Sequence, residues 1–223
     1  MFKELLIYNN PKSIFSESIR TLRTNIEFSL AANNSKLFMV TSSLPSDGKS
    51  FISSNLAVAF SMTDLKVLLV DCDMRKGRLH KIFNVSSEKG LSNLLLDDVK
   101  NFKKYVIKTK IDNVSLLPIG IVPPNPSELL NSDKFKNLLA QLERSYDLVI
   151  LDTPPINSVS DSLVIAKNVD EAVIVTSYKR TPMEELLETK KALENTGVKI
   201  AGVVINKMEG KKSHRYYYDK YYK

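Results

Sequence analysis

Short apolar runs alternate with segments of helical periodicity along this chain. Six of the runs are apolar almost throughout and have the length of a strand. Continuous apolar strands are typical of parallel sheets whose two faces are both covered by helices. The pattern therefore predicts an α/β fold with a doubly wound, mostly parallel sheet. The predicted strands are 36–41, 66–70, 114–117, 148–151, 172–176 and 200–205.

Helices are expected in most of the intervals between these strands. In the segment 16–31, Ile19, Leu22 and Ile26 recur at helical spacing and predict an amphipathic helix. The proline-rich stretch 123–126 predicts a loop, and Ser127 is the expected cap of a helix that ends near Tyr146. The first ten residues predict no element. Further helices are predicted at 47–62, 90–96, 102–107 and 183–195.

Charge divides the chain into a body and a tail. The 223 residues carry a net charge of +7, and six basic against two acidic residues place +4 of it between residues 207 and 223. Five of the nine tyrosines also fall in the last eight residues. We therefore expect one domain over residues 1–206 and a flexible, basic, tyrosine-rich tail over 207–223. The clustered tyrosines are Tyr216, Tyr217, Tyr218, Tyr221 and Tyr222.

Cysteine content and hydropathy indicate the compartment. Cys72 is the only cysteine, so the sequence predicts neither a disulfide framework nor a thiolate metal cluster. No apolar run approaches the roughly 20 residues of a membrane-spanning helix. The first residues also lack the pattern of a signal peptide. We expect a cytoplasmic protein.

The segment 43–50 carries the most specific chemistry. It reads Ser-Leu-Pro-Ser-Asp-Gly-Lys-Ser, which is the spacing of a P-loop with Ser43 in place of the first glycine, a deviant Walker A motif. It lies between a predicted strand and a predicted helix, where backbone N–H groups can hold phosphate oxygens. Lys49 would reach the β- and γ-phosphates of a nucleotide, and the Ser50 hydroxyl would ligate Mg²⁺.

Carboxylates follow two other predicted strands. Asp71 and Asp73 come at the end of the strand 66–70, and Asp152 ends the strand 148–151 in the form of a Walker B motif. The carboxyl ends of parallel strands face the ligand crevice of such a fold. If the first of these strands continues past Val70, Asp71 and Asp73 point the same way. Carboxylates in this position suit Mg²⁺ and the acceptance of a proton.

Taken together, these motifs resemble those of the bacterial tyrosine kinases that regulate capsular and exopolysaccharide synthesis. The resemblance runs from about residue 16 to the C-terminus, and one departure is Gly77, where the family usually has proline. The matching features are Pro45 and Asp47 in the P-loop, Asp71, Asp73 and Arg75 in the second motif, the segment 152–155, the segment 123–130, the first-helix residues Glu17, Arg20 and Arg23, and the tyrosine tail.

The resemblance implies an ATP-dependent protein-tyrosine autokinase of P-loop NTPase fold that phosphorylates its own tail and uses ATP and Mg²⁺. It implies Lys49 as a catalytic residue, with Asp71 or Asp73 taking the proton of the attacking tyrosine. Asn206 follows the last strand, where it either reads an adenine edge or only ends the strand. The implied nucleotide contacts are Ser46, Asp47, Gly48, Lys49, Ser50, Phe51 and Asn206, and the implied metal ligands are Ser50, Asp71, Asp73 and Asp152.

The same resemblance implies partners. It implies that Glu17, Arg20 and Arg23 mediate assembly into a ring. At ~100° per residue they lie on an arc of the first helix that is largely separate from its apolar stripe, which leaves them free to meet another subunit. A transmembrane adaptor that recruits the chain to the inner face of the membrane, and a cognate tyrosine phosphatase, are also implied, whereas nucleic acid is not. The alternative on the residues alone is that these three form an ordinary solvated helix face.

A second function class shares the deviant P-loop. Partitioning and septum-positioning ATPases are nucleotide-gated switches, and they normally carry a second lysine early in the loop. Residues 41–47 of this chain contain no lysine. That absence and the tyrosine tail favour the kinase, while the switch remains the alternative.

Overall fold

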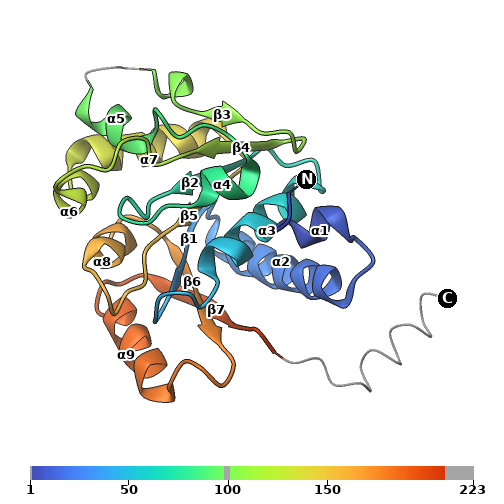
Figure 1. Cartoon of the computed structure of the whole chain (residues 1–223). Helices are drawn as coiled ribbons and strands as arrows, with labels where there is room; N and C mark the ends of the chain where they lie inside the picture. Colours follow the sequence, from blue (N-terminus) through green and yellow to red (C-terminus); the bar gives the residue numbers. More distant parts are fainter. Residues whose placement is uncertain (1, 98–100, 209–223) are drawn as a thin grey trace.

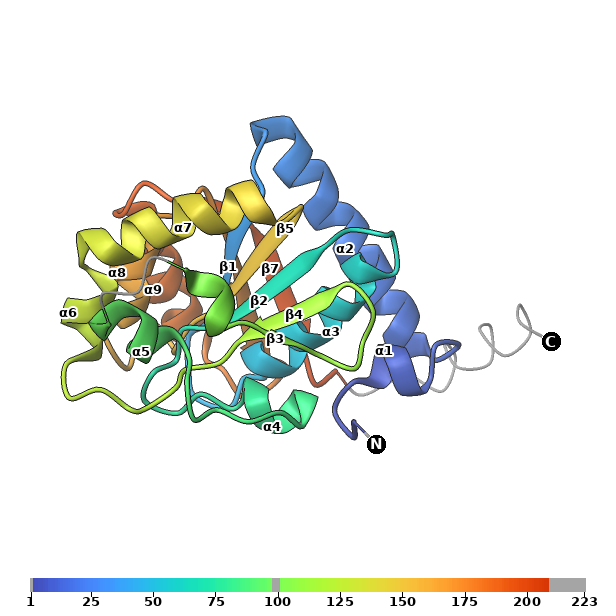
Figure 2. The same cartoon turned by 90° about the horizontal axis from the view of Figure 1, so that it is seen from above.

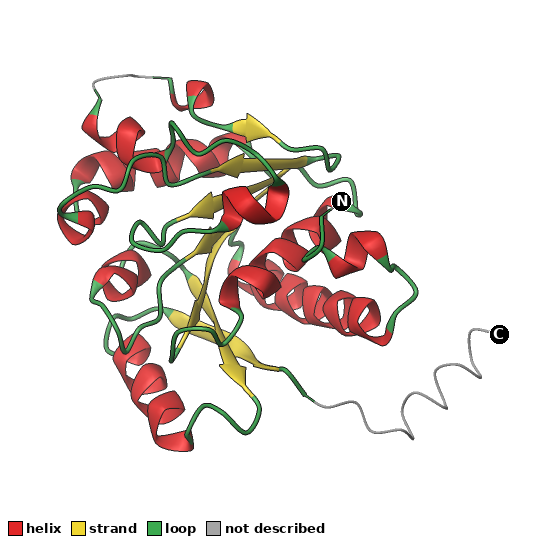
Figure 3. Cartoon of the chain, in the orientation of Figure 1, coloured by secondary structure: helices red, strands yellow, loops and turns green. Residues whose placement is uncertain are grey.

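A single seven-stranded sheet organises the computed structural model, which describes residues 2–97 and 101–208. The strand order is β3-β4-β2-β5-β1-β6-β7, and each adjacent pair is parallel except β3 with β4 (Figures 1 and 3). This confirms the mostly parallel α/β fold. The strands are β1 (Leu37–Ser42), β2 (Val67–Asp71), β3 (Ile107–Lys108), β4 (Val114–Leu117), β5 (Leu148–Asp152), β6 (Glu171–Ser177) and β7 (Lys199–Asn206).

Helices cover both faces of this sheet, as Figure 2 shows from above. Helices α1 (Leu6–Asn9), α2 (Ile14–Asn33), α3 (Lys49–Ser61) and α4 (Leu79–Phe83) pack on one face. The opposite face carries α5 (Leu91–Leu96), the 3₁₀ turn Phe102–Lys104, α6 (Pro126–Leu130), α7 (Asp133–Ser145), α8 (Asp161–Ala166) and α9 (Met183–Glu194). The sheet is therefore doubly wound.

The two helical layers explain why the strands are apolar without alternation. In β1, Leu37 and Met39 pack into the core under α5 to α9, whereas Phe38 and Val40 pack into the core under α1 to α4. Successive side chains of a strand point to opposite faces. Apolar residues are therefore favoured at successive positions when both faces are covered, and all six residues of β1 are buried, with the polar Thr41 and Ser42 only at its carboxyl end.

Several predicted boundaries were wrong because short polar caps decide them. The predicted helix from Ser127 to near Tyr146 is two helices, α6 and α7, since Ser132 starts the second one. The Ser132 hydroxyl accepts a hydrogen bond from the Phe135 N–H at 3.2 Å, as a helix N-cap does. Ser127 lies inside α6 instead.

Other elements had no sequence signal or a misleading one. The predicted helix 102–107 is a single 3₁₀ turn followed by the two-residue strand β3, and the predicted helix 47–62 begins two residues later, at Lys49. Helices α1, α4 and α8 have six or fewer residues, too few for a periodic pattern to be visible.

The predicted tail lies mostly beyond the described residues. Lys207 and Met208 follow β7, while the five clustered tyrosines fall within 209–223 and so outside the described part of the chain. Among the helices of residues 2–97 and 101–208, none is both long enough and apolar enough to cross a membrane.

Candidate active site

The P-loop connects the carboxyl end of β1 to the start of α3. Gly48 precedes the helix with a φ of 102°, a left-handed conformation that favours glycine. A Cβ on Gly48 would lie 2.1 Å from the Asn206 Nδ2 atom, so a larger residue would also have to displace the Asn206 side chain from the loop. Lys49 is the first residue of α3, and this places its side chain at the carboxyl edge of the sheet.

Side chains from three parts of the chain hold the loop in shape. The buried Asp47 carboxylate accepts hydrogen bonds from the Leu44 N–H at 3.0 Å and from the Thr181 hydroxyl at 2.8 Å. The Asn206 amide donates to the Asp47 carbonyl at 2.9 Å, and the Lys207 ammonium donates to the Ser46 carbonyl at 2.5 Å. The side chains of Asp47 and Asn206, both predicted as nucleotide contacts, thus face the loop itself.

Both polar side-chain atoms of Asn206 form hydrogen bonds within the chain. Besides the bond to Asp47, its Oδ1 atom accepts the Lys207 N–H at 2.8 Å. The structure gives Asn206 a role in bracing the P-loop. Contact with an adenine edge stays a prediction.

Lys49 is held among three aspartates. Its ammonium donates to the Asp73 carboxylate at 3.0 Å and lies 3.9 Å from Asp152 Oδ2. Asp71 and Asp152 are register partners at the ends of the neighbouring strands β2 and β5. Burial opposes the charge of Lys49, but the pKa of its ammonium is nevertheless raised, because Asp152 and Asp73 lie so close.

Two of these carboxylates are fully buried and electrostatically strained. Burial, reinforced by the neighbouring Asp152, raises the pKa of Asp71 well above its usual range, although the Leu79 N–H donates to it at 3.0 Å. Burial likewise raises the pKa of Asp152, against the opposing effects of Lys49 and Ser50. Asp71 Oδ1 and Asp152 Oδ2 are buried oxygens with no hydrogen-bond partner among the described residues.

These two oxygens, which accept no hydrogen bond from the described residues, fit a hard cation. Mg²⁺ is usually held by one or two carboxylates together with hydroxyl, water and phosphate oxygens, so it does not need an all-protein cage. No cage is formed here: within residues 2–97 and 101–208, no three His, Cys, Asp or Glu residues are grouped to hold a metal ion. The predicted metal ligands lie near one another, and the Lys49 ammonium lies among them. These ligands are Ser50, Asp71, Asp73 and Asp152.

A cavity of about 330 Å³ opens in front of this cluster. Asp73 lines it, while the buried Asp71 and Asp152 do not. The two prolines after Asp152 also line it. On the P-loop side its walls are Pro45, Ser46, Gly48, Lys49, Ser50 and Phe51.

The cavity has three cationic side chains besides Lys49, and the sequence argument identified only one of them as a candidate. Arg75, Lys76 and Arg78 all line it, and Arg78 forms an ion pair with Glu4 at 2.5 Å. Their clustering in the five residues 74–78, directly after the acidic motif, was the available signal. They make the cavity suitable for a polyanion such as a triphosphate.

Asp161 is a structural residue that the sequence did not reveal. Arg75 donates to it twice, from Nε at 2.9 Å and from Nη2 at 3.2 Å, and the Ser127 hydroxyl donates to it as well. Although burial works in the opposite direction, these hydrogen bonds lower the pKa of the Asp161 carboxyl. The interaction joins the segment 123–130 to the turn that follows Asp73.

Close contacts around residue 77 explain why a glycine suits this position in this chain. A Cβ at this position would lie 2.7 Å and 2.8 Å from the two carboxylate oxygens of Asp71, and 2.5 Å from a side-chain carbon of Ile119. The turn 75–80 therefore packs directly against the buried carboxylate.

The three predicted assembly residues differ in their surroundings. Arg20 and Glu17 form a partly exposed ion pair at 2.8 Å, and Arg20 also donates to the Pro11 carbonyl at 2.6 Å. Arg23 instead donates to the Ala59 carbonyl of α3 at 3.0 Å, and its Nε atom is buried without a hydrogen-bond partner among the described residues. Arg23 thus faces its own chain more than the expected arc suggested.

Comparison with known proteins agrees with this geometry. Residues 46–200 match a family model described as an AAA domain. CapB of Staphylococcus aureus, which is named as a tyrosine-protein kinase, is 39% identical over 214 residues, covering 96% of this chain and 93% of CapB. The chain belongs to the bacterial tyrosine-protein kinases. The tyrosine-protein kinase Ptk of Acinetobacter johnsonii is 38% identical over 205 residues, but the match spans only 28% of Ptk.

Solved kinase structures have the same fold. The crystal structure of the chimerical protein CapA2B2 matches with a TM-score of 0.88 and 40% identity over 94% of this chain and 92% of that one. The kinase domain of the Escherichia coli tyrosine kinase ETK matches with a TM-score of 0.89 and 35% identity over 94% of this chain and 82% of that domain. The septum site-determining protein MinD of Pyrococcus horikoshii shares the fold alone, with 22% identity and a TM-score of 0.66.

The raised pKa of Asp71 has a consequence for stability. In the metal-free folded chain Asp71 keeps its proton to higher pH than in the unfolded chain. Between the ordinary and the raised pKa the folded state binds more protons, so the stability from Asp71 is present at low pH and is lost as the pH rises through this window.

We therefore predict that Asp71→Asn raises the melting temperature of the metal-free chain at pH 8, by about 2–4 °C for each kcal/mol gained, and that the gain shrinks towards pH 5. Thermal unfolding at both pH values in the presence of a chelator measures this. Asp133→Asn, an exposed carboxylate on α7, is the matched control. If the melting temperatures of Asp71→Asn and the wild type differ equally at both pH values, or if the variant is less stable at pH 8, the raised pKa of Asp71 is contradicted.

Proposed function

We propose that this chain is an ATP-dependent protein-tyrosine autokinase whose phosphoryl-transfer centre is the P-loop cavity in front of Lys49. The observation that carries the proposal is the cluster of Lys49 with Asp71, Asp73 and Asp152 at the end of a P-loop cleft. Kinship to tyrosine-protein kinases supports it. The CapB-like relatives also support a role in capsular or exopolysaccharide synthesis.

The chemistry follows from the charges. Phosphoryl transfer depends mainly on positioning and on stabilising the charge of the transferring group. Lys49 supplies positive charge at the loop, and Arg75, Lys76 and Arg78 supply more around the cavity. The Ser50 hydroxyl and the oxygens of Asp71 and Asp152 that lack a hydrogen bond are the groups that would hold Mg²⁺, which neutralises phosphate charge when it is bound.

Asp73 is the better candidate for the proton acceptor. Of the two aspartates left open by the sequence, only Asp73 lines the cavity where a tyrosine hydroxyl can arrive. Asp71 is fully buried and bonded to the Leu79 N–H. A general base must come within hydrogen-bond reach of the proton it takes, so we assign this role to Asp73.

Lys49→Met should abolish labelling of the chain by γ-labelled ATP with Mg²⁺, because it removes the ammonium that faces the cavity. Lys191→Met, an exposed lysine on α9, is the matched control and should label like the wild type. Acid-stable label on tyrosine supports the kinase, whereas release of phosphate without protein label would support a nucleotide-gated switch. Labelling of Lys49→Met within a few-fold of wild type would remove Lys49 from the centre.

The tail tyrosines are the proposed substrates. Removing residues 215–223 should eliminate most self-labelling and leave nucleotide affinity and the melting temperature nearly unchanged, because the tail is substrate and not core. Mapping of phosphotyrosine by mass spectrometry checks this against Tyr105, which is buried and donates to Asp97 at 2.6 Å. Label mainly on Tyr105 or Tyr146 would refute it.

Assembly into a ring would let one subunit's tail enter its neighbour's cavity. Glu17→Ala with Arg20→Ala should reduce the mass in light scattering and depress self-labelling. This pair is preferred to a triple variant because Arg23 also bonds α3. Lys190→Ala with Glu194→Ala on α9, which form an exposed ion pair at 2.9 Å, controls for the loss of a charge pair. Unchanged mass together with unchanged labelling would return these residues to an ordinary solvated face.

An activating partner completes the proposal. The match to a chimerical CapA2B2 protein, and relatives of which this chain spans under a third, support a partner that is fused in some kinases and separate in others. We propose a transmembrane adaptor that recruits the chain to the inner face of the membrane, with a tyrosine phosphatase to reverse the modification. An activator must bind the ATP-bound state more tightly. An adaptor peptide should therefore increase both ATP affinity and self-labelling, and full labelling without it would oppose this part.

A further inference from the structure

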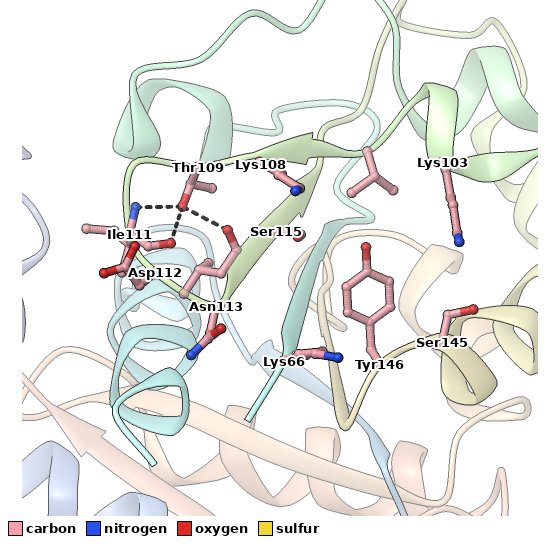
Figure 4. A pocket seen from close by; sticks show the side chains of 12 residues that line it. Lys66, Lys103, Lys108, Thr109, Ile111, Asp112, Asn113, Ser115, Ser145 and Tyr146 are labelled. Carbon is pink, nitrogen blue, oxygen red and sulfur yellow. Dashed lines mark hydrogen bonds between the residues drawn. The ribbon is translucent and has the colours of Figure 1, made fainter. Parts of the chain in front are cut away.

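A second and larger cavity lies away from the P-loop. Its volume is about 620 Å³, and it opens at the amino ends of β2 and β4, beside β3 and the end of α7 (Figure 4). The P-loop cavity lies at the carboxyl ends of the strands, and the two cavities share no lining residue among the described parts of the chain. The proposed kinase reaction makes no use of this second cavity.

Three lysines line the cavity and make it basic. Lys66 precedes β2, Lys103 lies in the 3₁₀ turn and Lys108 lies in β3, and all three are exposed. None of their ammonium groups has an ion pair or hydrogen bond among the described residues. Asp112 is the one acidic residue among those lining the cavity, and Asp147 is nearby, accepting the Lys66 backbone N–H at 2.9 Å. The cavity therefore carries a net positive charge.

The remaining walls combine an aromatic ring with a fixed turn. In Figure 4 the ring of Tyr146 stands in the cavity with the three lysines around it. The Thr109 hydroxyl fixes the turn that leads into β4, accepting the Ile111 N–H at 3.0 Å and donating to the Val114 carbonyl at 2.9 Å. Val106 and Val114 add apolar surface, and Ser115 and Ser145 add hydroxyls.

This combination suits an anion attached to an aromatic ring. Ammonium groups bind phosphate as compact point charges, and a tyrosine ring packs well against another aromatic ring. The volume lies in the range of small-ligand sites, and it exceeds what a single inorganic ion needs. Phosphotyrosine carries both features on one side chain.

We propose that this cavity is a phosphotyrosine-binding site that receives the phosphorylated tail of a second copy of the chain. The proposal rests on the proposed function for its supply of phosphotyrosine. The unmodified tail has a net charge of +4 and is repelled by the lysines. Each phosphate adds about −1.5 to −2, so about three modifications reverse its sign. The modified tail would thus carry the charge opposite to that of the three lysines of this cavity.

Geometry favours the tail of a second copy over the chain's own. The described chain ends after β7, at the opposite edge of the sheet from β3 and β4. Six strand spacings of about 4.8 Å separate these edges by about 29 Å through the molecule. The eight residues from Met208 to Tyr216 reach at most about 29 Å when fully extended, so the chain's own Tyr216 has no length left for the path around the surface. The tail of a second copy can present any of its five tyrosines.

The test measures binding of a synthetic, fluorescent peptide of residues 213–223 with its tyrosines phosphorylated to the full-length, unphosphorylated chain. We expect binding that weakens with salt, no binding of the unphosphorylated peptide, and no displacement by ADP with Mg²⁺. Replacing Lys66, Lys103 and Lys108 together by glutamine should weaken binding at least about tenfold. Glutamine at Lys12, Lys167 and Lys191, which are exposed elsewhere, removes the same charge and should change binding little.

Several outcomes would overturn the proposal. These are equal affinity of the two lysine variants at equal melting temperatures, displacement of the peptide by ADP, and binding of inorganic phosphate as tight as that of the phosphopeptide. Because the peptide is synthetic, its binding is measurable whether or not the chain phosphorylates itself. A loss of kinase activity and a loss of this site therefore give different results.

Discussion

The largely buried ammonium of Lys49 among three aspartates is the interaction on which the active site depends. A buried charge is costly unless it is paired, and Lys49 finds partners only because β2 and β5 end in register at Asp71 and Asp152, with Asp73 two residues further on. One cation against three carboxylates leaves the cluster short of positive charge. Burial raises the pKa of Asp71 and of Asp152, and neighbouring carboxylates add to the effect, so the cluster is receptive to a proton or a divalent cation.

The same region ties the P-loop to the end of the domain. Asp47 bonds Thr181, which follows β6, and Asn206 and Lys207 at the end of β7 bond the carbonyls of Asp47 and Ser46. Lys207 is also the residue at which the basic segment begins. The position of the P-loop is therefore connected through two hydrogen bonds to the root of the segment that carries the proposed substrate tyrosines.

Sequence reasoning succeeded where long patterns decide the structure. The apolar strands, the P-loop between β1 and α3, and the acidic strand ends were all predicted, because double burial and the ligand crevice impose them on the residues. Sequence reasoning failed where a single contact determines the local structure. The break between α6 and α7 depends on one Ser132 cap, and the role of Asp161 depends on its meeting Arg75 across 86 positions. The hydrogen bonds by which Asp47 and Asn206 hold the P-loop could not be predicted either, because a motif records the spacing of residues and not the direction of a side chain.

The central claim is that Lys49 and its three aspartates form the phosphoryl-transfer centre. A crystal structure with Mg²⁺ and a non-hydrolysable ATP analogue tests it most directly. The account predicts that the Lys49 ammonium leaves Asp73 and lies at about 2.7–3.2 Å from a phosphate oxygen, with Ser50 and a buried aspartate oxygen directed at the metal. A nucleotide bound elsewhere, with the Lys49–Asp73 ion pair still at 3.0 Å, would contradict it.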